Sequence, residues 1–335
     1  MKPIAKHITI HDNEKRIKLL IKELVLAPRL NALKWSKITD QTPNMKIGYP
    51  GQHLASLVVG MKGKKTGARG NDIVDGSEVK SCSRVDASDK CNNCDEKLLR
   101  TETVCPACDS KDIKRDNTSK WLFTIRSVKD LTLLTKTVKR VVLVLADYPN
   151  FDKQDFNVIR FQVFEIWTNS ERCSAFKAVM TDYYKNVYLS HKKKTPNKTP
   201  APQNFWPYSF QFYNCSPIKT FSCIVSNANS KPVVKIEHYI KPSVDRNTLA
   251  SELMPTILLN KKEFLHLLNK ASQQLIKENL ADPKSYNEFV ALVKKKSTSM
   301  KKFATLMPTL NEEIRKTLPI RKAKPFTIKT KHVRR

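Results

Sequence analysis

Two short segments of this sequence contain residue types whose spacing suits metal chemistry. The first, NDIVDGSEVK, places the carboxylates of Asp72 and Glu78 close in sequence to the ammonium group of Lys80. The second contains two Cys-x2-Cys pairs, formed by Cys91, Cys94, Cys105 and Cys108. Carboxylate oxygens favour hard cations such as Mg²⁺, whereas four thiolates favour Zn²⁺. The two segments therefore predict two metal sites with different tasks.

The acidic segment predicts a catalytic centre at the end of a sheet. Residues 77–84 have the pattern of a strand, so Glu78 and Lys80 project from one face and Val79 projects from the other, into the core. Asp72 precedes this strand by a tight turn and can return to the same face. Two carboxylates and one lysine would then converge.

Hydrolysis of a phosphodiester explains why these residue types belong together. Negative charge builds on the phosphoryl oxygens and on the leaving oxygen. A divalent cation held by Asp72 and Glu78 would offset that charge and lower the pKa of a bound water. Lys80 would position the water and contact the phosphate. Its ammonium group should stay charged beside two carboxylates, so we expect positioning and not proton abstraction.

A Glu-x-Lys triplet alone fits a surface ion pair on a strand equally well, so its surroundings matter. All seven glycines of the chain lie between Gly48 and Gly76, and the triplet follows the basic, glycine-rich stretch KGKKTGARG. Backbone amides of that stretch are expected to hold phosphates, together with the side chains of Lys64, Lys65 and Arg69. This context favours the catalytic interpretation.

Four further residues are candidates for the same site. Asp75 competes with Asp72 as the first carboxylate, but it lies so close to the strand that little room is left for a turn. Glu23, on the first predicted helix, is either an additional metal ligand or a solvated surface residue. Gln52 and His53 begin the next predicted helix, although a single histidine is more often structural.

The charge balance predicts a polyanionic partner. Lys and Arg total 61 against 31 Asp and Glu in 335 residues, and the net charge of +30 is spread along most of the chain. Such an excess favours nucleic acid. An anionic membrane is disfavoured, because no long basic amphipathic helix and no apolar run of spanning length stand out. The N-terminus lacks an apolar signal core, so we expect a cytoplasmic, intracellular protein of a bacterium or archaeon.

The four cysteines predict a structural zinc site. Each pair forms a knuckle, and two knuckles separated by ten residues close a tetrahedral four-cysteine site with no open coordination position. An iron–sulfur cluster and two redox pairs are the alternatives. Zinc would supply folding energy to a segment with little apolar core. The module could also contact DNA through Lys90, Lys97, Arg100, Lys111, Lys114 and Arg115. The remaining cysteines are expected to be buried thiols: Cys82, Cys173, Cys215 and Cys223.

The pattern of apolar residues predicts an α/β fold. Helices are expected at residues 12–27, with Pro28 as the stop, and at 52–59, 128–137 and 171–189. Strands are expected at 77–84, 121–126, 141–148 and 157–167. The run VVLVLA is typical of a strand buried on both faces of a mixed sheet. After a Lys- and Pro-rich linker at 191–203, strands are expected in FWPYSFQFY, TFSCIV and VVKIEHYI, and helices at 246–318.

These elements suggest two regions. Residues 1–190 would form a catalytic core, a mixed central sheet flanked by helices, with the zinc module inserted at 86–118. Residues 191–335 would form a mostly helical C-terminal region with a basic tail. We expect this region to contribute DNA recognition, dimer contacts or both, but no residue in it can be assigned to a base.

The acidic segment also resembles a known nuclease pattern. Asp-x5-Glu-x-Lys followed by apolar strands resembles the PD-(D/E)xK nuclease superfamily. The stretches GYPGQHLASLVVG, TGARGNDIVDGSEVKSCSRVD and CNNC look like the MamI-type family of type II restriction endonucleases, over residues 48–108. The resemblance implies Mg²⁺-dependent double-strand cleavage that leaves 5′-phosphate and 3′-hydroxyl ends. Asp72 and Glu78 match the metal carboxylates and Lys80 matches the lysine, while Asn71 replaces the proline of the pattern.

Three functions fit these observations. The first is a type II restriction endonuclease that cleaves a short symmetric site as a homodimer and is encoded near a cognate DNA methyltransferase. The second is a non-catalytic zinc-ribbon DNA-binding protein in which the acidic segment is surface charge. The third is a repair or structure-selective nuclease. Metal-dependent plasmid cutting separates the first from the second, and discrete fragments separate the first from the third.

Overall fold

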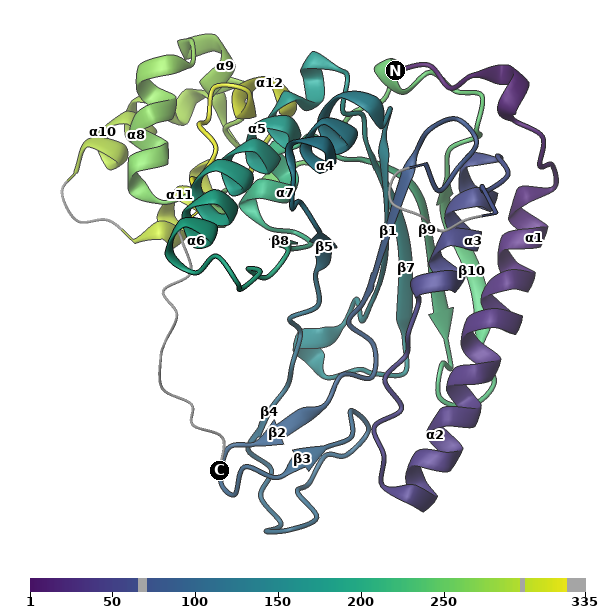
Figure 1. Ribbon diagram of the computed structural model, residues 1–335. Coiled ribbons are helices and arrows are strands. Elements are labelled where there is room, and N and C mark those ends of the chain that lie inside the picture. Colours follow the sequence, from purple (N-terminus) through teal and green to yellow (C-terminus); the bar gives the residue numbers. More distant parts are fainter. Residues whose placement is uncertain (66–70, 296–298, 324–335) are drawn as a thin grey trace. The chain divides into compact units, whose positions relative to one another are not determined.

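The chain divides into two compact units in the computed structural model, which describes residues 1–65, 71–295 and 299–323 (Figure 1). The first unit comprises Met1–Trp121, Val138–Trp167 and Ile218–Leu249. The second comprises Leu122–Thr137, Thr168–Pro217 and Ala250–Arg335. The boundary expected near residue 190 does not coincide with this division, because the segment from Ile218 to Leu249 returns to complete the sheet of the first unit. The basic tail from residue 324 lies outside the described residues.

The first unit is built on a five-stranded mixed sheet with the order β1-β6-β7-β9-β10. Its strands are β1 (Glu78–Ser83), β6 (Val141–Asp147), β7 (Ile159–Ile166), β9 (Ile218–Ser226) and β10 (Val233–Tyr239). β1 runs parallel to β6, and the other neighbours pair antiparallel. Every residue of β6 is buried, which confirms the predicted strand covered on both faces. β1, the strand with the Glu-x-Lys triplet, lies at an edge.

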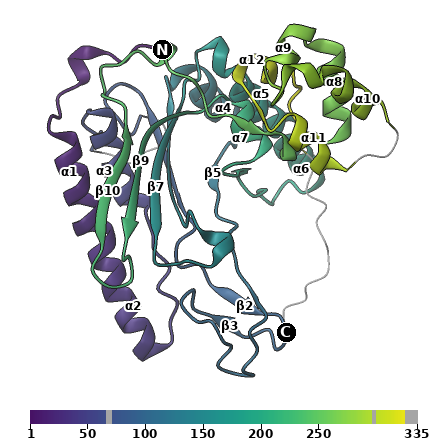
Figure 2. The ribbon, with the colours of Figure 1, turned by 180° about the vertical axis from the view of Figure 1, so that it is seen from behind.

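Helices cover one face of this sheet. α3 (Gly48–Val59) packs on β1 and β6, while α1 (Asn13–Leu20) packs on α3 and β10 (Figure 2). Apolar side chains of both helices meet the sheet in one core, to which Ile17, Leu54, Val58, Val142 and Val144 belong. Burial of each such side chain contributes about 1.5–3 kcal/mol, so this core fixes α3 against β1.

Pro28 does not end the first helix, contrary to the prediction. α1 continues through the π-helical segment η2 (Ile21–Leu26) into α2 (Ala27–Thr39). The N–H of Ala27 bonds to the carbonyl of Lys22, five residues back, so the hydrogen-bond register changes just before the proline. Pro28, which has no backbone N–H to donate, follows directly after this change of register, at the beginning of α2.

The cysteine segment forms a small module within the first unit. Its three-stranded sheet has the order β3-β2-β4, with β2 (Asp89–Cys91), β3 (Lys97–Leu98) and β4 (Ile113–Lys114). The buried core of the module consists of Cys91, Leu98 and Cys105 alone, with Cys108 and Ile113 packed against it. Two of these three buried apolar residues are cysteines, so the apolar core of the module depends on what holds the cysteines together.

The second unit is mostly helical, as predicted for residues 246–318. Its longer elements are α4 (Val128–Thr132), η3 (Leu133–Thr137), α5 (Ser174–Tyr183), η6 (Tyr184–Tyr188), α6 (Leu189–Lys194), α7 (Phe210–Asn214), α8 (Lys261–Lys270), α9 (Gln273–Lys277), α10 (Tyr286–Lys294), α11 (Met300–Leu306) and α12 (Glu312–Arg315). β11 (Met254–Pro255) and β12 (Thr309–Leu310) pair antiparallel. No helix in the described ranges is both long enough and apolar enough to cross a membrane.

Two predicted strands differ in this region. The strand expected at 121–126 is reduced to β5 (Trp121–Phe123), which pairs with the short β8 (Gln203–Phe205) and not with the five-stranded sheet. The aromatic run FWPYSFQFY is not a continuous strand, because Ser209 caps helix α7 by accepting the N–H of Phe212. Four of its six aromatic residues are nevertheless buried, namely Phe205, Phe210, Phe212 and Tyr213.

Candidate active site and cysteine cluster

Asp72 lies against the free edge of β1. The N–H of Glu78 donates to the carbonyl of Arg140, at the start of β6, at 3.1 Å. Because successive N–H groups of a strand alternate in direction, the N–H of Val79 points away from β6. Asp72 Oδ2 accepts that N–H at 2.8 Å. The carboxylate therefore caps the exposed edge of the strand that carries the Glu-x-Lys triplet.

Glu78 and Lys80 lie together on the face of β1 opposite to Val79. Val79 is buried in the core beneath α3, as the alternation of the strand predicts. Lys80 Nζ is 2.5 Å from Glu78 Oε1, and the side chains are 29% and 5% exposed. The second oxygen, Glu78 Oε2, is buried and has no hydrogen-bond partner within residues 1–65, 71–295 and 299–323. An ionised oxygen buried in this way costs free energy unless a cation or donor satisfies it, so its position fits a metal ligand.

The three side chains are electrostatic neighbours. Burial raises the pKa of Asp72 above its ordinary value; the hydrogen bond from Val79 opposes this shift, the Glu78 carboxylate adds to it, and Lys80 opposes it. The structure thus brings Asp72, Glu78 and Lys80 together at one sheet edge. Among the described residues, the group of three or more potential metal ligands is the four-cysteine cluster, so at this edge Asp72 and Glu78 could offer a cation two carboxylates and no third side chain of that kind.

A basic pocket of about 510 Å³ opens beside Asp72, on the α3 side of β1. Its lining includes Lys64 and Lys65, the predicted phosphate contacts, and also Lys62, which the sequence did not single out. Arg69 lies outside the described residues. Of the three residues Asp72, Glu78 and Lys80, Asp72 alone is part of the lining.

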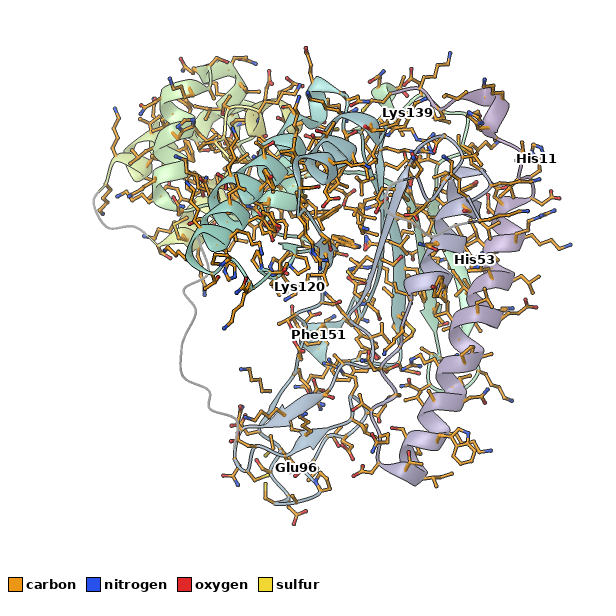
Figure 3. The ribbon with its side chains drawn as sticks, viewed as in Figure 1. His11, His53, Glu96, Lys120, Lys139 and Phe151 are labelled. Atoms are coloured by element: carbon orange, nitrogen blue, oxygen red, sulfur yellow. The ribbon has the colours of Figure 1, made fainter. Side chains whose placement is uncertain are left out.

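Gln52 and His53, in the second turn of α3, also line this pocket. The helix begins at Gly48, four residues before the predicted start at Gln52. Gln52 Nε2 is 3.5 Å from Asp72 Oδ1, a long hydrogen bond. His53 is exposed on α3 and has no contact of that kind (Figure 3). The helix approaches the strand closely because Gly51 has no side chain: a Cβ there would lie 2.8 Å from Ser81 Cβ.

Two predicted candidates do not join the site. Glu23 is exposed on η2 and does not line the pocket. Asp75 is buried, and its Oδ2 pairs with Arg140 Nη2 at 3.0 Å. Its Oδ1 accepts the N–H of Ser77 at 3.1 Å and the hydroxyl of Ser77 at 2.6 Å. Both oxygens of Asp75 are therefore engaged inside the protein.

A buried group of charges behind this turn was missed by sequence reasoning. Arg140 pairs with Glu165 at 3.0 Å, and Arg246 pairs with the same carboxylate at 3.1 Å. Burial alone would raise the pKa of Glu165, but Arg140, Arg246 and a hydrogen bond from Trp167 lower it to about 2. Arg140 could have indicated this group of charges in the sequence. It directly precedes the apolar run of β6, and a charged side chain that is buried there requires a buried partner.

The four cysteines form a cluster that can hold a metal ion. Their sulfur atoms all lie within 4.8 Å of one another. Cys91 and Cys108 are 3.6 Å apart and Cys94 and Cys105 are 3.5 Å apart, measured between sulfurs. Four bonds of roughly 2.3 Å to a tetrahedral ion require sulfur separations of roughly 3.8 Å. The spacing of the cluster therefore suits such an ion.

Both knuckles adopt the same backbone conformation. The N–H of Asp95 bonds to the carbonyl of Cys91 at 3.2 Å, and that of Asp109 bonds to Cys105 at 2.9 Å. Both aspartates have left-handed φ angles, 65° and 56°. Aspartate tolerates this conformation better than most residues, which explains why each knuckle continues as Cys-x2-Cys-Asp.

Arg100 and Arg115 anchor the module from inside and are not the surface contacts that the sequence suggested. Both pair with the buried Asp89, at 3.1 and 2.8 Å. The guanidinium of Arg100 also lies over the rings of Phe151 and Phe156, 5.2 and 5.1 Å from their centres. The four lysines of the module are exposed as expected: Lys90, Lys97, Lys111 and Lys114. The other four cysteines are buried thiols, as predicted.

Fold and site together define an α/β protein with an acid–lysine cluster on an edge strand and a module whose four clustered cysteines could hold a metal ion. The MamI restriction endonuclease family matches residues 34–257, which include both features, and the chain belongs to that family. The type II restriction enzyme MamI of Microbacterium ammoniaphilum is 37% identical to it over 57 residues. That similarity covers 17% of this chain and 18% of the relative. The search of solved structures found no match.

Proposed function

We propose that this protein is a type II restriction endonuclease that hydrolyses duplex DNA at a short specific site, with Mg²⁺ held by Asp72 and Glu78. The observation that carries the proposal is the buried Glu78 Oε2, which lacks a hydrogen-bond partner and lies beside Lys80 and Asp72. Membership of the MamI restriction endonuclease family supports the same activity. The mixed sheet would then be a PD-(D/E)xK core, and the products would carry 5′-phosphate ends.

Each residue of the site has a task in this proposal. Bound Mg²⁺ would offset charge on the reacting phosphate and lower the pKa of a water. Asp72 and Glu78 each present a carboxylate oxygen to the cation, and the Val79 N–H keeps Asp72 in place. Lys80, partly exposed, holds the scissile phosphate and orients the attacking water. Lys62, Lys64 and Lys65 hold the neighbouring DNA backbone, with Arg69 proposed for the same task.

The cysteine cluster is proposed to hold Zn²⁺ in a structural role. It has four thiolates and no open position, and its sulfur spacing fits a tetrahedral ion. A homodimer is proposed because two-fold symmetric DNA sites match symmetric dimers. The C-terminal region would then contribute base readout or dimer contacts, and a cognate DNA methyltransferase would be encoded nearby.

Plasmid cleavage tests the proposal. We expect discrete fragments with Mg²⁺ and none with EDTA. Glu78→Gln and Lys80→Ala should bind DNA normally but cut at least about 100-fold more slowly, because each removes a group that stabilises developing charge. Glu23→Gln, which neutralises an exposed carboxylate outside the pocket, serves as the matched control and should cut like the wild type.

The possible outcomes separate the alternatives. Undiminished cutting by Glu78→Gln and Lys80→Ala rejects the site. DNA binding without any metal-dependent cutting supports a zinc-ribbon DNA-binding protein. Nicks or smears in place of discrete fragments support a repair or structure-selective nuclease. Sequencing the ends of discrete fragments gives the recognition sequence, the cut position and the overhang in one experiment.

A further inference from the structure

Asp72 and Glu78 flank one tight turn. The chain reverses between them through a hydrogen bond from the Gly76 N–H to the Ile73 carbonyl at 3.0 Å. Gly76 has a φ of 90°, a conformation that a residue with a side chain rarely adopts. The separation of the two carboxylates therefore depends on how firmly this turn is held.

Arg140 holds the turn at three points. Its Nε donates to Ser77 Oγ at 2.9 Å, and its Nη2 donates to Asp75 Oδ2 at 3.0 Å. Its backbone carbonyl accepts the N–H of Glu78 at 3.1 Å. The Ser77 hydroxyl in turn donates to Asp75 Oδ1 at 2.6 Å, which closes a ring of hydrogen bonds. The side chain of Arg140 is fully buried.

Arg140 is itself fixed from behind. Its Nη1 donates to Glu165 at 3.0 Å, and its guanidinium lies 5.1 Å from the centre of the Trp167 ring. Glu165 also pairs with Arg246. The buried group of Asp75, Glu165, Arg140 and Arg246 contains two negative and two positive charges. If Arg140 left the turn, the buried carboxylates of Asp75 and Glu165 would be left with Arg246 as their one positive charge, at a large cost in free energy.

We propose that Arg140 is a positioning residue that fixes the Asp75–Ser77 side of the turn and so sets the spacing of Asp72 and Glu78 for a divalent cation. This inference rests on the proposed function, because it assumes that those two carboxylates bind metal. A buried ion pair is weak evidence for stability alone. Arg140 instead lies at the turn between the two proposed ligands, where it can set the distance between their carboxylates. Residues that hold metal ligands in place change metal affinity about 10- to 100-fold.

Ser77→Ala tests this role while leaving every charge of the group in place. It removes the hydroxyl that joins Arg140 to Asp75. Trp167→Phe is the matched control: it removes a hydrogen bond of 2.9 Å to Glu165 on the far side of the group but keeps a ring beside Arg140. Mn²⁺ affinity is measured without DNA from the electron paramagnetic resonance signal of free Mn²⁺, and thermal unfolding is followed in parallel.

We expect Ser77→Ala to weaken Mn²⁺ binding about tenfold and Trp167→Phe to leave it unchanged, at similar losses of thermal stability. Ser77→Thr, which keeps a hydroxyl, should restore the affinity. Equal Mn²⁺ affinities in Ser77→Ala, Trp167→Phe and the wild type would overturn the inference. So would wild-type Mn²⁺ binding in Glu78→Gln, because there would be no cation for the turn to position. If Glu78-dependent Mn²⁺ binding responds to Ser77→Ala but plasmid is not cut, the positioning role stands and the nuclease proposal fails.

Discussion

Replacement of Gly51 by alanine tests how closely α3 must approach β1. An added Cβ would lie 2.8 Å from Ser81 Cβ and 3.6 Å from Val144 Cγ1. Rotation of the Ser81 hydroxyl cannot relieve the overlap between the two β-carbons, so helix and strand must separate. Alanine in place of glycine favours a helix by up to about 1 kcal/mol. Overpacking costs about 1–3 kcal/mol, so once the helix gain is subtracted a net loss of up to about 2 kcal/mol is expected.

Thermal unfolding measures this loss. A change of 1 kcal/mol shifts the midpoint by about 2–4 °C for a domain of about 150–250 residues, so Gly51→Ala should lower it by a few degrees. Ser81→Gly makes room for the new methyl group. The loss of stability in the double variant should therefore be smaller than the sum of the losses in Gly51→Ala and Ser81→Gly. The difference, which is the coupling energy of the two sites, should be about 1 kcal/mol or more. Additive losses, or a more stable Gly51→Ala protein, would refute the close approach of α3 to β1.

Two further predictions concern buried charge and the cysteine cluster. The pKa of Glu165 is lowered from 4.5 to about 2 in the folded protein, so its ion pairs contribute stability that is present above pH 4.5 and lost as the pH falls toward 2. The free energy of unfolding in urea should depend less on pH across that range in Glu165→Gln than in the wild type. The same pH dependence in both proteins would contradict the ion pairs of Glu165. Cys105→Ser should lose bound zinc and become sensitive to protease within residues 86–118, because Cys105 belongs to the small core of the module. Cys82→Ser, at a buried thiol whose pKa burial raises to about 12, should keep one zinc per chain; zinc retained by Cys105→Ser would contradict the four-cysteine site.

Local patterns predicted the elements that carry the site. The apolar run of β6, the alternation around Val79 and the helix before the glycine-rich stretch all appear in the structure. Such patterns are reliable because neighbours a few residues apart set which face of a strand or helix is apolar. Pro28 was misjudged for the opposite reason: a change of hydrogen-bond register in the preceding π-helical turn, invisible in composition, lets the helix continue.

Partners distant in sequence could not be chosen from the sequence. Asp72 and Asp75 have the same side chain and lie three positions apart, yet only Asp75 is paired with Arg140, from the start of β6. Arg100 and Arg115 were assigned with the surface lysines of the module, although both pair with the buried Asp89. In each case the segment that packs beside the charged residue decides whether its side chain is buried in an ion pair or exposed.

The sequence by itself determined the strand that presents Glu78 with Lys80 and the cysteine knuckles, because both follow from spacing over a few residues. Tertiary structure alone decided the unit to which β9 and β10 belong, the oxygen of Glu78 that is buried without a partner, and the pairing of Arg140 behind the turn. Burial and charge pairing arise only when distant segments meet, since the free energy of a buried charge depends on every group packed around it.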